Sequence, residues 1–183
     1  MWLERRYYDS FMQIMQQQLQ MSDSVLKAMM PLLTDIYGNP SSLHSVGQIA
    51  KEHLEAARET VAECIGADPK EIYFTSGGSE ADNQAIRSAA YIGARKGKKH
   101  IISSKFEHHA VLHTLDALKK EGFTVTLLDV YSNGIVKPED VANAITEETC
   151  LVTIMTANNE IGTIQPIAEI GKICKEKGVL FIQ

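Results

Sequence analysis

Short apolar runs alternate with helical segments along most of this chain, and this alternation constrains the fold more than any other feature. The apolar runs are continuous rather than interrupted by polar residues, and short links join them to the helical segments. Continuous apolar strands are buried on both faces, and strands joined through helices run parallel. The sequence therefore predicts an α/β fold: a mostly parallel sheet with helices on both faces, in three αβα layers.

Five apolar runs are expected to be strands. Each of the first four is followed by a polar or glycine-containing segment. The five runs are residues 72–74, 100–103, 124–128, 150–155 and 179–182. The helices are expected near residues 22–30, 46–65, 79–95, 106–121 and 166–177, and one more is expected to open at residues 137–140. Gly66 marks the C-cap of the longest helix, and Pro138 stands near the first position of a helix that begins with acids.

The first 21 residues do not share this pattern. Their apolar positions are irregular, and three consecutive glutamines interrupt a methionine-rich stretch. We interpret residues 1–21 as an atypical N-terminal arm. Residues 22–183 are expected to form one domain, or a large part of one.

Composition narrows the class of protein. Hydrophobic residues make up 44% and charged residues 22%, which is typical of a soluble globular protein. A net charge of −5 predicts no general attraction to nucleic acid or to an anionic membrane, and no run is apolar enough to span a bilayer. Cys64, Cys150 and Cys174 form no CxxC pair and are expected to be buried free thiols. Together with the lack of a signal-peptide pattern, this predicts a cytoplasmic location.

Residues 72–83 combine an apolar run, a Ser-Gly-Gly turn and a helix start rich in acids. This geometry binds phosphate, because the first amides of a helix have no internal partner and carry partial positive charge. Gly77 and Gly78 allow close approach of an anion, and Ser79 offers an amide and a hydroxyl. An ordinary turn with Ser79 as the N-cap of the helix fits the same residues, and both interpretations stay open.

Polar clusters follow three of the expected strands. Gly77–Ser79 follows the first, Glu107 and His108 the second, and residues 158–160 the fourth. Ligands of open parallel sheets bind beyond the carboxyl ends of the strands, so these clusters are expected to share one crevice. By contrast, His109 and His113 are spaced like zinc ligands but lack a third ligand, and an exposed helix face is favoured. Lys105 is interpreted as an ordinary solvated lysine.

Four segments together resemble a known family. Residues 37–44, 74–83, 107–112 and 157–166 look like the corresponding motifs of cysteine desulfurases, in the same order. These are pyridoxal-phosphate enzymes of the class V aminotransferase group, which supply sulfur for iron–sulfur clusters. The resemblance extends from about residue 22 to residue 181. It implies the large domain of a fold type I pyridoxal-phosphate transferase, of which this chain matches an incomplete, N-terminal part.

The resemblance also implies roles for individual residues. Gly78 and Ser79 match the pair that holds the phosphate of pyridoxal 5'-phosphate. His108 matches the histidine that stacks on the pyridine ring and is the candidate catalytic group for proton transfer. Asn159 matches the asparagine that hydrogen-bonds the phenolic oxygen of the cofactor. The family converts L-cysteine to L-alanine and leaves a persulfide on an enzyme cysteine, and a sulfur-acceptor scaffold protein is the implied partner.

Other family features have no match here. The Schiff-base lysine of a Ser-x-His-Lys motif, the aspartate that pairs with the pyridine nitrogen and the sulfur-accepting cysteine are all missing from the sequence. The chain is therefore expected to be a fragment that is inactive alone. Its last apolar strand is expected to promote homo-oligomerisation or self-association.

Alternatives to a desulfurase follow from the same residues. One is a non-enzymatic interaction module that pairs with another chain through its incomplete sheet. The four motifs disfavour another, an unrelated phosphate- or nucleotide-binding domain. Cysteine and selenocysteine both remain candidate substrates.

Overall fold

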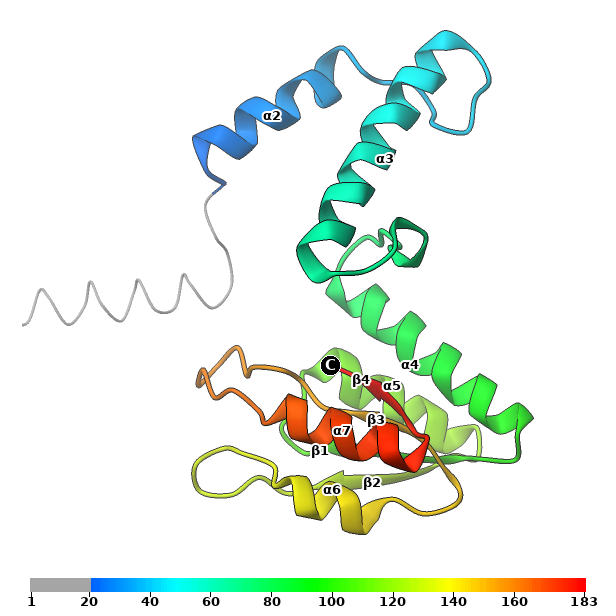
Figure 1. The fold of residues 1–183 in the computed structure, drawn as a ribbon, viewed down its shortest axis with the longest axis vertical. Coiled ribbons are helices and arrows are strands. Elements are labelled where there is room, and N and C mark those ends of the chain that lie inside the picture. Colours follow the sequence, from blue (N-terminus) through cyan, green and yellow to red (C-terminus); the bar gives the residue numbers. More distant parts are fainter. Residues whose placement is uncertain (1–20) are drawn as a thin grey trace, which may run out of the picture. The chain divides into compact units, whose positions relative to one another are not determined.

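The structure, a computed structural model, describes residues 21–183. The described chain divides into two compact units, residues 21–74 and Thr75–Gln183 (Figure 1). Most of the expected N-terminal arm lies outside the described residues. Among the described helices, none is long and apolar enough to cross a membrane.

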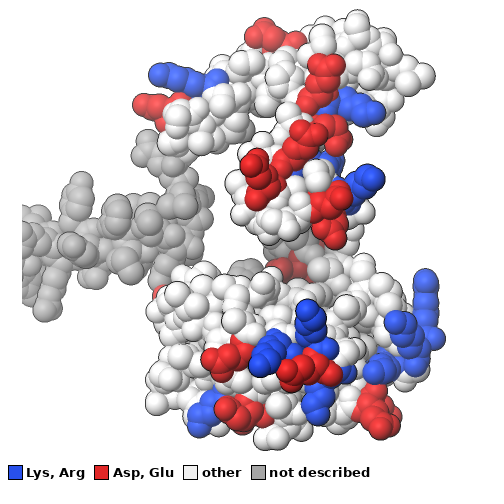
Figure 2. Space-filling view, viewed as in Figure 1, with Lys and Arg blue, Asp and Glu red and all other residues white. Residues whose placement is uncertain are grey.

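The described part of the first unit, residues 21–74, contains two helices and a short 3₁₀ turn. Helix α2 spans Asp23–Thr34 and is capped, as expected, by Ser22, whose hydroxyl accepts a hydrogen bond from the Val25 amide. Helix α3 spans Ser45–Ile65 and ends at Gly66 in the left-handed conformation, which confirms that C-cap. In the view of Figure 2, acidic side chains gather along α3 with basic ones between them, and both signs of charge are also mixed on the second unit.

The expected strand at residues 72–74 is not formed. These residues follow the 3₁₀ turn Pro69–Glu71, are extended and pair with no strand in the described chain. Tyr73 and Phe74 are 75% and 50% exposed. Instead of a sheet, the segment meets α3: the Arg58 guanidinium donates to the carbonyl oxygen of Ile72 and lies over the Phe74 ring. The β-branched and aromatic residues were a correct signal for extended backbone but not for a neighbouring strand.

The second unit holds a four-stranded parallel sheet in the order β2-β1-β3-β4. The strands are β1 His100–Ser104, β2 Thr124–Leu128, β3 Thr149–Thr153 and β4 Leu180–Ile182. The helices are α4 Gly78–Arg95, α5 His109–Lys120, α6 Pro138–Ala144 and α7 Ile167–Lys177. Four of the five expected strands are therefore confirmed, with ends displaced by at most two residues.

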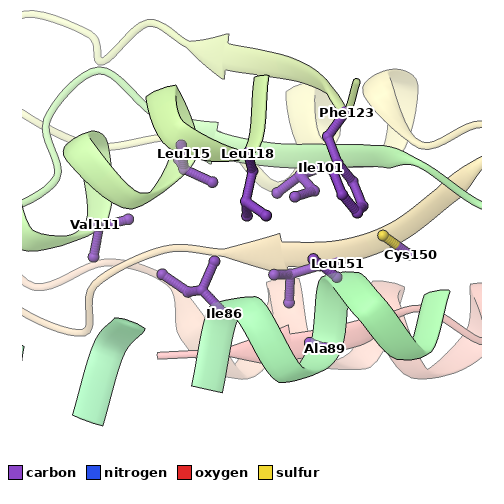
Figure 3. Packing of buried hydrophobic residues seen from close by; sticks show 10 residues of the cluster. Ile86, Ala89, Ile101, Val111, Leu115, Leu118, Phe123, Cys150 and Leu151 are labelled. Carbon is purple, nitrogen blue, oxygen red and sulfur yellow. The ribbon is translucent and has the colours of Figure 1, made fainter. Parts of the chain in front are cut away.

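Helices cover both faces of this sheet, as the continuous apolar runs predicted. On one face, Ile101 and Leu151 pack against α4 and α5 (Figure 3). Figure 3 shows Leu115 and Leu118 of α5 directed toward Ile101. On the other face, Ile102 and Val152 pack against α6 and α7. Neighbouring residues of one strand point to opposite faces, so each central strand serves two hydrophobic cores.

The expectation of three buried thiols is correct for two of them. Cys150 and Cys174 are buried in the two cores, but Cys64, near the end of α3, is exposed. Its residue type suggested burial, but in that part of α3 only Ala62 is buried. Burial raises the pKa of the Cys174 thiol to about 11 and also raises the pKa of Cys150.

A buried histidine ties three strands together at the amino ends of the sheet. The His100 ring lies 2.8 Å from the Thr149 hydroxyl of β3 through Nδ1 and 2.9 Å from the Thr126 hydroxyl of β2 through Nε2. Burial lowers the pKa of His100. The charge of nearby Glu148 raises this pKa, but by less than burial lowers it. Protonation of this ring is therefore less favourable in the folded chain than protonation of a solvated histidine.

This histidine should make folding stability depend on pH. Because its folded pKa is depressed, its neutral form contributes fully above the unfolded pKa of about 6.5, and stability falls as pH drops below that value. We expect urea unfolding to show that the free energy of unfolding falls more between about pH 7.5 and about pH 5.5 in the parent than in His100→Gln. The dependence of this free energy on pH should differ between the two proteins by at most about 1.4 kcal/mol per pH unit. Equal losses in the two proteins would contradict this assignment.

Candidate active site

A pocket of about 200 Å³ opens at the carboxyl ends of β1 and β3. It is formed by the segment that joins β1 to α5 and by the loop after β3. Its lining residues are Lys105, Phe106, Glu107, His108, His109, Leu112, Asn158, Asn159 and Glu160. Two predicted site residues, His108 and Asn159, thus lie in one pocket although 51 positions separate them in the sequence.

His108 occupies the N-cap of α5 rather than its first turn. Its Nδ1 accepts a hydrogen bond from the Ala110 amide at 3.1 Å. In the neutral ring, the proton must therefore be on Nε2, which remains available as a donor. Helix α5 was expected to begin three residues earlier, at residue 106, and its later start places the histidine side chain at the pocket.

Glu107 is buried behind His108, with 8% of its surface exposed. Its Oε1 accepts hydrogen bonds from the Met155 amide at 2.8 Å and from the Ser104 hydroxyl at 3.3 Å. Burial raises the pKa of Glu107, and the charge of Asp82 raises it further, whereas the two hydrogen bonds lower it. The pocket wall therefore contains a carboxyl group for which ionisation is unfavourable compared with a solvated glutamate.

Asn158 is buried and Asn159 is exposed. The side-chain oxygen of Asn158 accepts from the amides of Glu160 and Ile161, at 2.8 and 3.0 Å. Its Nδ2 lies 3.4 Å from the carbonyl oxygen of Phe106, across the pocket. The first of the two asparagines thus shapes the loop, and the second is left with its amide side chain accessible.

Gly78 and Ser79 do not line this pocket; they begin α4 in the same unit. Gly77 is the N-cap, without a side-chain hydrogen bond, so the interpretation of Ser79 as the N-cap is wrong. The amides of Gly78 and Ser79 have no hydrogen-bond partner among the described residues, while Glu80 turns back to the amide and hydroxyl of Ser76. A β-carbon built on Gly77 or Gly78 would meet nothing, so this helix start is open to an anion.

Contacts from α4 to α5 connect this helix start to the pocket. The Thr114 hydroxyl donates to Asn83 Oδ1 at 2.6 Å, and Asn83 Nδ2 donates to the carbonyl oxygen of Ser79. Asp82, one residue earlier, is near enough to Glu107 to affect its pKa. The Asn83–Thr114 contact was not predictable from the sequence pattern, because it joins two helices across 31 positions.

The remaining candidates are exposed, and two of them, Lys105 and His109, lie at the pocket. Lys105 forms an ion pair with Asp129 at 2.6 Å. His109 and His113 stack loosely, with ring centroids 5.6 Å apart, and the described residues contain no group of three metal-binding side chains. A larger and more open hollow of about 520 Å³ lies beside β2 and α6 and contains no predicted site residue.

Comparison with known proteins identifies what this arrangement is similar to. A family model described as aminotransferase class V matches residues 19–183. Cysteine desulfurase IscS of Clostridium botulinum is 55% identical over 157 residues, which cover 86% of this chain and 39% of that protein. The mitochondrial cysteine desulfurase of Drosophila melanogaster is 49% identical over 162 residues, which cover 88% of this chain and 35% of that protein. This chain therefore spans about two fifths of the length of these curated relatives.

Solved structures show the same likeness in three dimensions. A NifS-like protein superposes with a TM-score of 0.87 at 40% identity, over 91% of this chain and 46% of its own. DndA from Streptomyces lividans superposes with a TM-score of 0.82 at 36% identity, over 90% of this chain and 46% of its own.

Proposed function

We propose, from the premise that this chain belongs to the aminotransferase class-V family, that its second unit supplies one wall of the pyridoxal-phosphate site of a cysteine desulfurase. The observation that carries the proposal is the pocket that joins His108 to Asn159 at the carboxyl ends of two parallel strands. Names of the similar proteins support the choice of cysteine as substrate.

The residues present suit this cofactor. Its phosphate would be held at the start of α4, by the free amides of Gly78 and Ser79, the Ser79 hydroxyl and the positive end of the helix dipole. The ring of His108 would stack on the pyridine ring, and the Asn159 amide would donate to its phenolic oxygen. When bound, pyridoxal phosphate supplies an electron sink for carbanion chemistry on an amino acid.

His108 would position the ring and carry a proton. Its Nδ1 is engaged by the Ala110 amide, so Nε2 is the atom that can release or accept a proton at the pocket. The overall change would convert L-cysteine and an acceptor thiol into L-alanine and a persulfide on that acceptor. Cys150 and Cys174 are poor acceptors, because burial raises their pKa values and keeps them as thiols.

The wider setting is proposed on the same basis. The product persulfide would feed iron–sulfur cluster assembly in the cytoplasm, through a sulfur-acceptor scaffold protein. Residues 22–183 would belong to one large domain. Self-association remains a proposal supported by β4, an edge strand whose Leu180 is 51% exposed.

Substitution of His108 tests the proposal. Titration with pyridoxal 5'-phosphate, followed by calorimetry, should show binding to the parent chain that weakens about two- to tenfold in His108→Ala, because ring stacking is lost. His108→Asn keeps an N-cap acceptor and should restore stability but not affinity. His113→Ala, on the exposed face of α5, is the matched control. A parent chain that does not bind the cofactor would overturn the proposed function.

A further inference from the structure

Two buried side chains cross between the segments that form the pocket. Glu107 belongs to the segment after β1 and accepts from the Met155 amide, after β3. Asn158 belongs to the loop after β3 and donates to the carbonyl oxygen of Phe106, after β1. Each segment therefore contributes one side chain that hydrogen-bonds the main chain of the other.

Each of these two side chains belongs to the residue directly before a predicted site residue. Glu107 immediately precedes His108, and Asn158 immediately precedes Asn159. Both are buried, with 8% and 6% of their surfaces exposed, whereas the residue after each is exposed. Each segment is thus anchored by one residue and presents the next one to the pocket.

Further hydrogen bonds keep each anchor in place within its own segment. The Ser104 hydroxyl donates to Glu107 and also accepts from the Phe106 amide at 3.2 Å. Asn158 accepts two amides of its own loop through its side-chain oxygen. The crossing contacts therefore join two segments that are each already ordered locally, so a shift of one should be transmitted to the other.

We propose that Glu107 and Asn158 form a reciprocal clasp that positions His108 opposite Asn159, and that Glu107 is a positioning residue of the site. This inference rests on the proposed function for the identity of the ligand, but the clasp itself is a property of the chain. In the described chain, the Glu107 side chain hydrogen-bonds the Ser104 hydroxyl and the Met155 amide, and neither the His108 nor the Asn159 side chain. It acts on both through the main chain.

Hydrogen exchange of backbone amides tests the clasp directly. In Glu107→Ala, exchange should accelerate about tenfold or more at Met155, which loses its acceptor, and also at Ile161 and Gly162, which Glu107 does not contact. Asn158→Ala should produce the reciprocal effect in the segment after β1, at the Ala110 amide, which donates to His108. Glu107→Gln keeps an oxygen in the same place and should retain the slow exchange of the parent.

His100→Leu is the matched control, because it removes a buried polar side chain with two hydrogen bonds from the other end of β1. A merely structural role for Glu107 predicts that both variants lower stability and affinity for pyridoxal 5'-phosphate alike. The clasp predicts that affinity falls about tenfold in Glu107→Ala, beyond any fall in His100→Leu, and recovers in Glu107→Gln.

Unchanged exchange at Ile161 and Gly162 in Glu107→Ala would overturn the clasp, as would equal losses of affinity in Glu107→Ala and His100→Leu. If Glu107→Ala does not fold, the Asn158→Ala and Glu107→Gln exchange patterns decide the question. If the parent chain does not bind the cofactor, the proposed function fails, and the exchange comparison alone supports or overturns the clasp.

Discussion

Replacing Ser79 with alanine is expected to weaken the binding of pyridoxal 5'-phosphate by about 1.5–3 kcal/mol, or roughly 10- to 150-fold. The substitution removes a hydroxyl that would donate to a charged phosphate oxygen. It leaves the backbone amide in place, and alanine is a good helix former, so α4 should keep its stability. Calorimetric titration of the parent and the variant measures the difference.

Two controls make this result specific for the phosphate. Ser88→Ala is the same substitution at an exposed position of the same helix and should bind the cofactor as the parent does. Pyridoxal without its phosphate should bind the parent and Ser79→Ala with equal affinity. Equal affinity of the two proteins for pyridoxal 5'-phosphate would remove Ser79 from the site.

Two glycines in helices that pack on the sheet should respond oppositely to alanine. Gly93 of α4 lies against Cys150 of β3, where an added β-carbon would overlap the Cys150 β-carbon and lie 2.9 Å from its sulfur. Gly93→Ala should therefore lower the free energy of unfolding by about 1–3 kcal/mol, despite the better helix propensity of alanine.

Gly171 of α7 is the matched comparison. Its added β-carbon would meet the Phe181 ring at 3.5 Å, an ordinary contact. Gly171→Ala should leave stability unchanged or raise it by up to about 1 kcal/mol. Urea unfolding of both variants tests the pair, and a stable Gly93→Ala protein would show that α4 can move away from β3 without loss.

The sequence predicted the second unit well because its strands are buried on both faces. Ile101 and Ile102 enter different cores, and so do Leu151 and Val152, which is why the runs are apolar without alternation. Residues 72–74 have the same local character but pair with no strand in the described chain. Local propensity cannot show whether a partner strand lies beside a segment, so this expectation was wrong.

Part of the site was predictable, to the level of strand ends. The rule that ligands bind at the carboxyl ends of parallel strands predicted one crevice for three polar clusters. The pocket contains His108 and Asn159 from two of them, but Gly77–Ser79 does not line it. The part played by Glu107 was not predictable. It depends on the Met155 amide, 48 positions away, and on an exact orientation of two loops that no spacing in the sequence encodes.

The order of the strands also determines when this pocket can exist as the chain folds. β1 pairs with β2, 24 residues onward at His100 and Thr124, but its other neighbour is β3, where His100 pairs with Thr149 across 49 positions. Closing the longer loop has the greater entropic penalty, and helices form locally before such distant pairings. The two walls of the pocket follow β1 and β3, so they meet only once that pairing is made. Binding of a ligand in this pocket therefore indicates that β1 and β3 have paired, which is the pairing with the largest sequence separation in the sheet. Helix content alone does not indicate this.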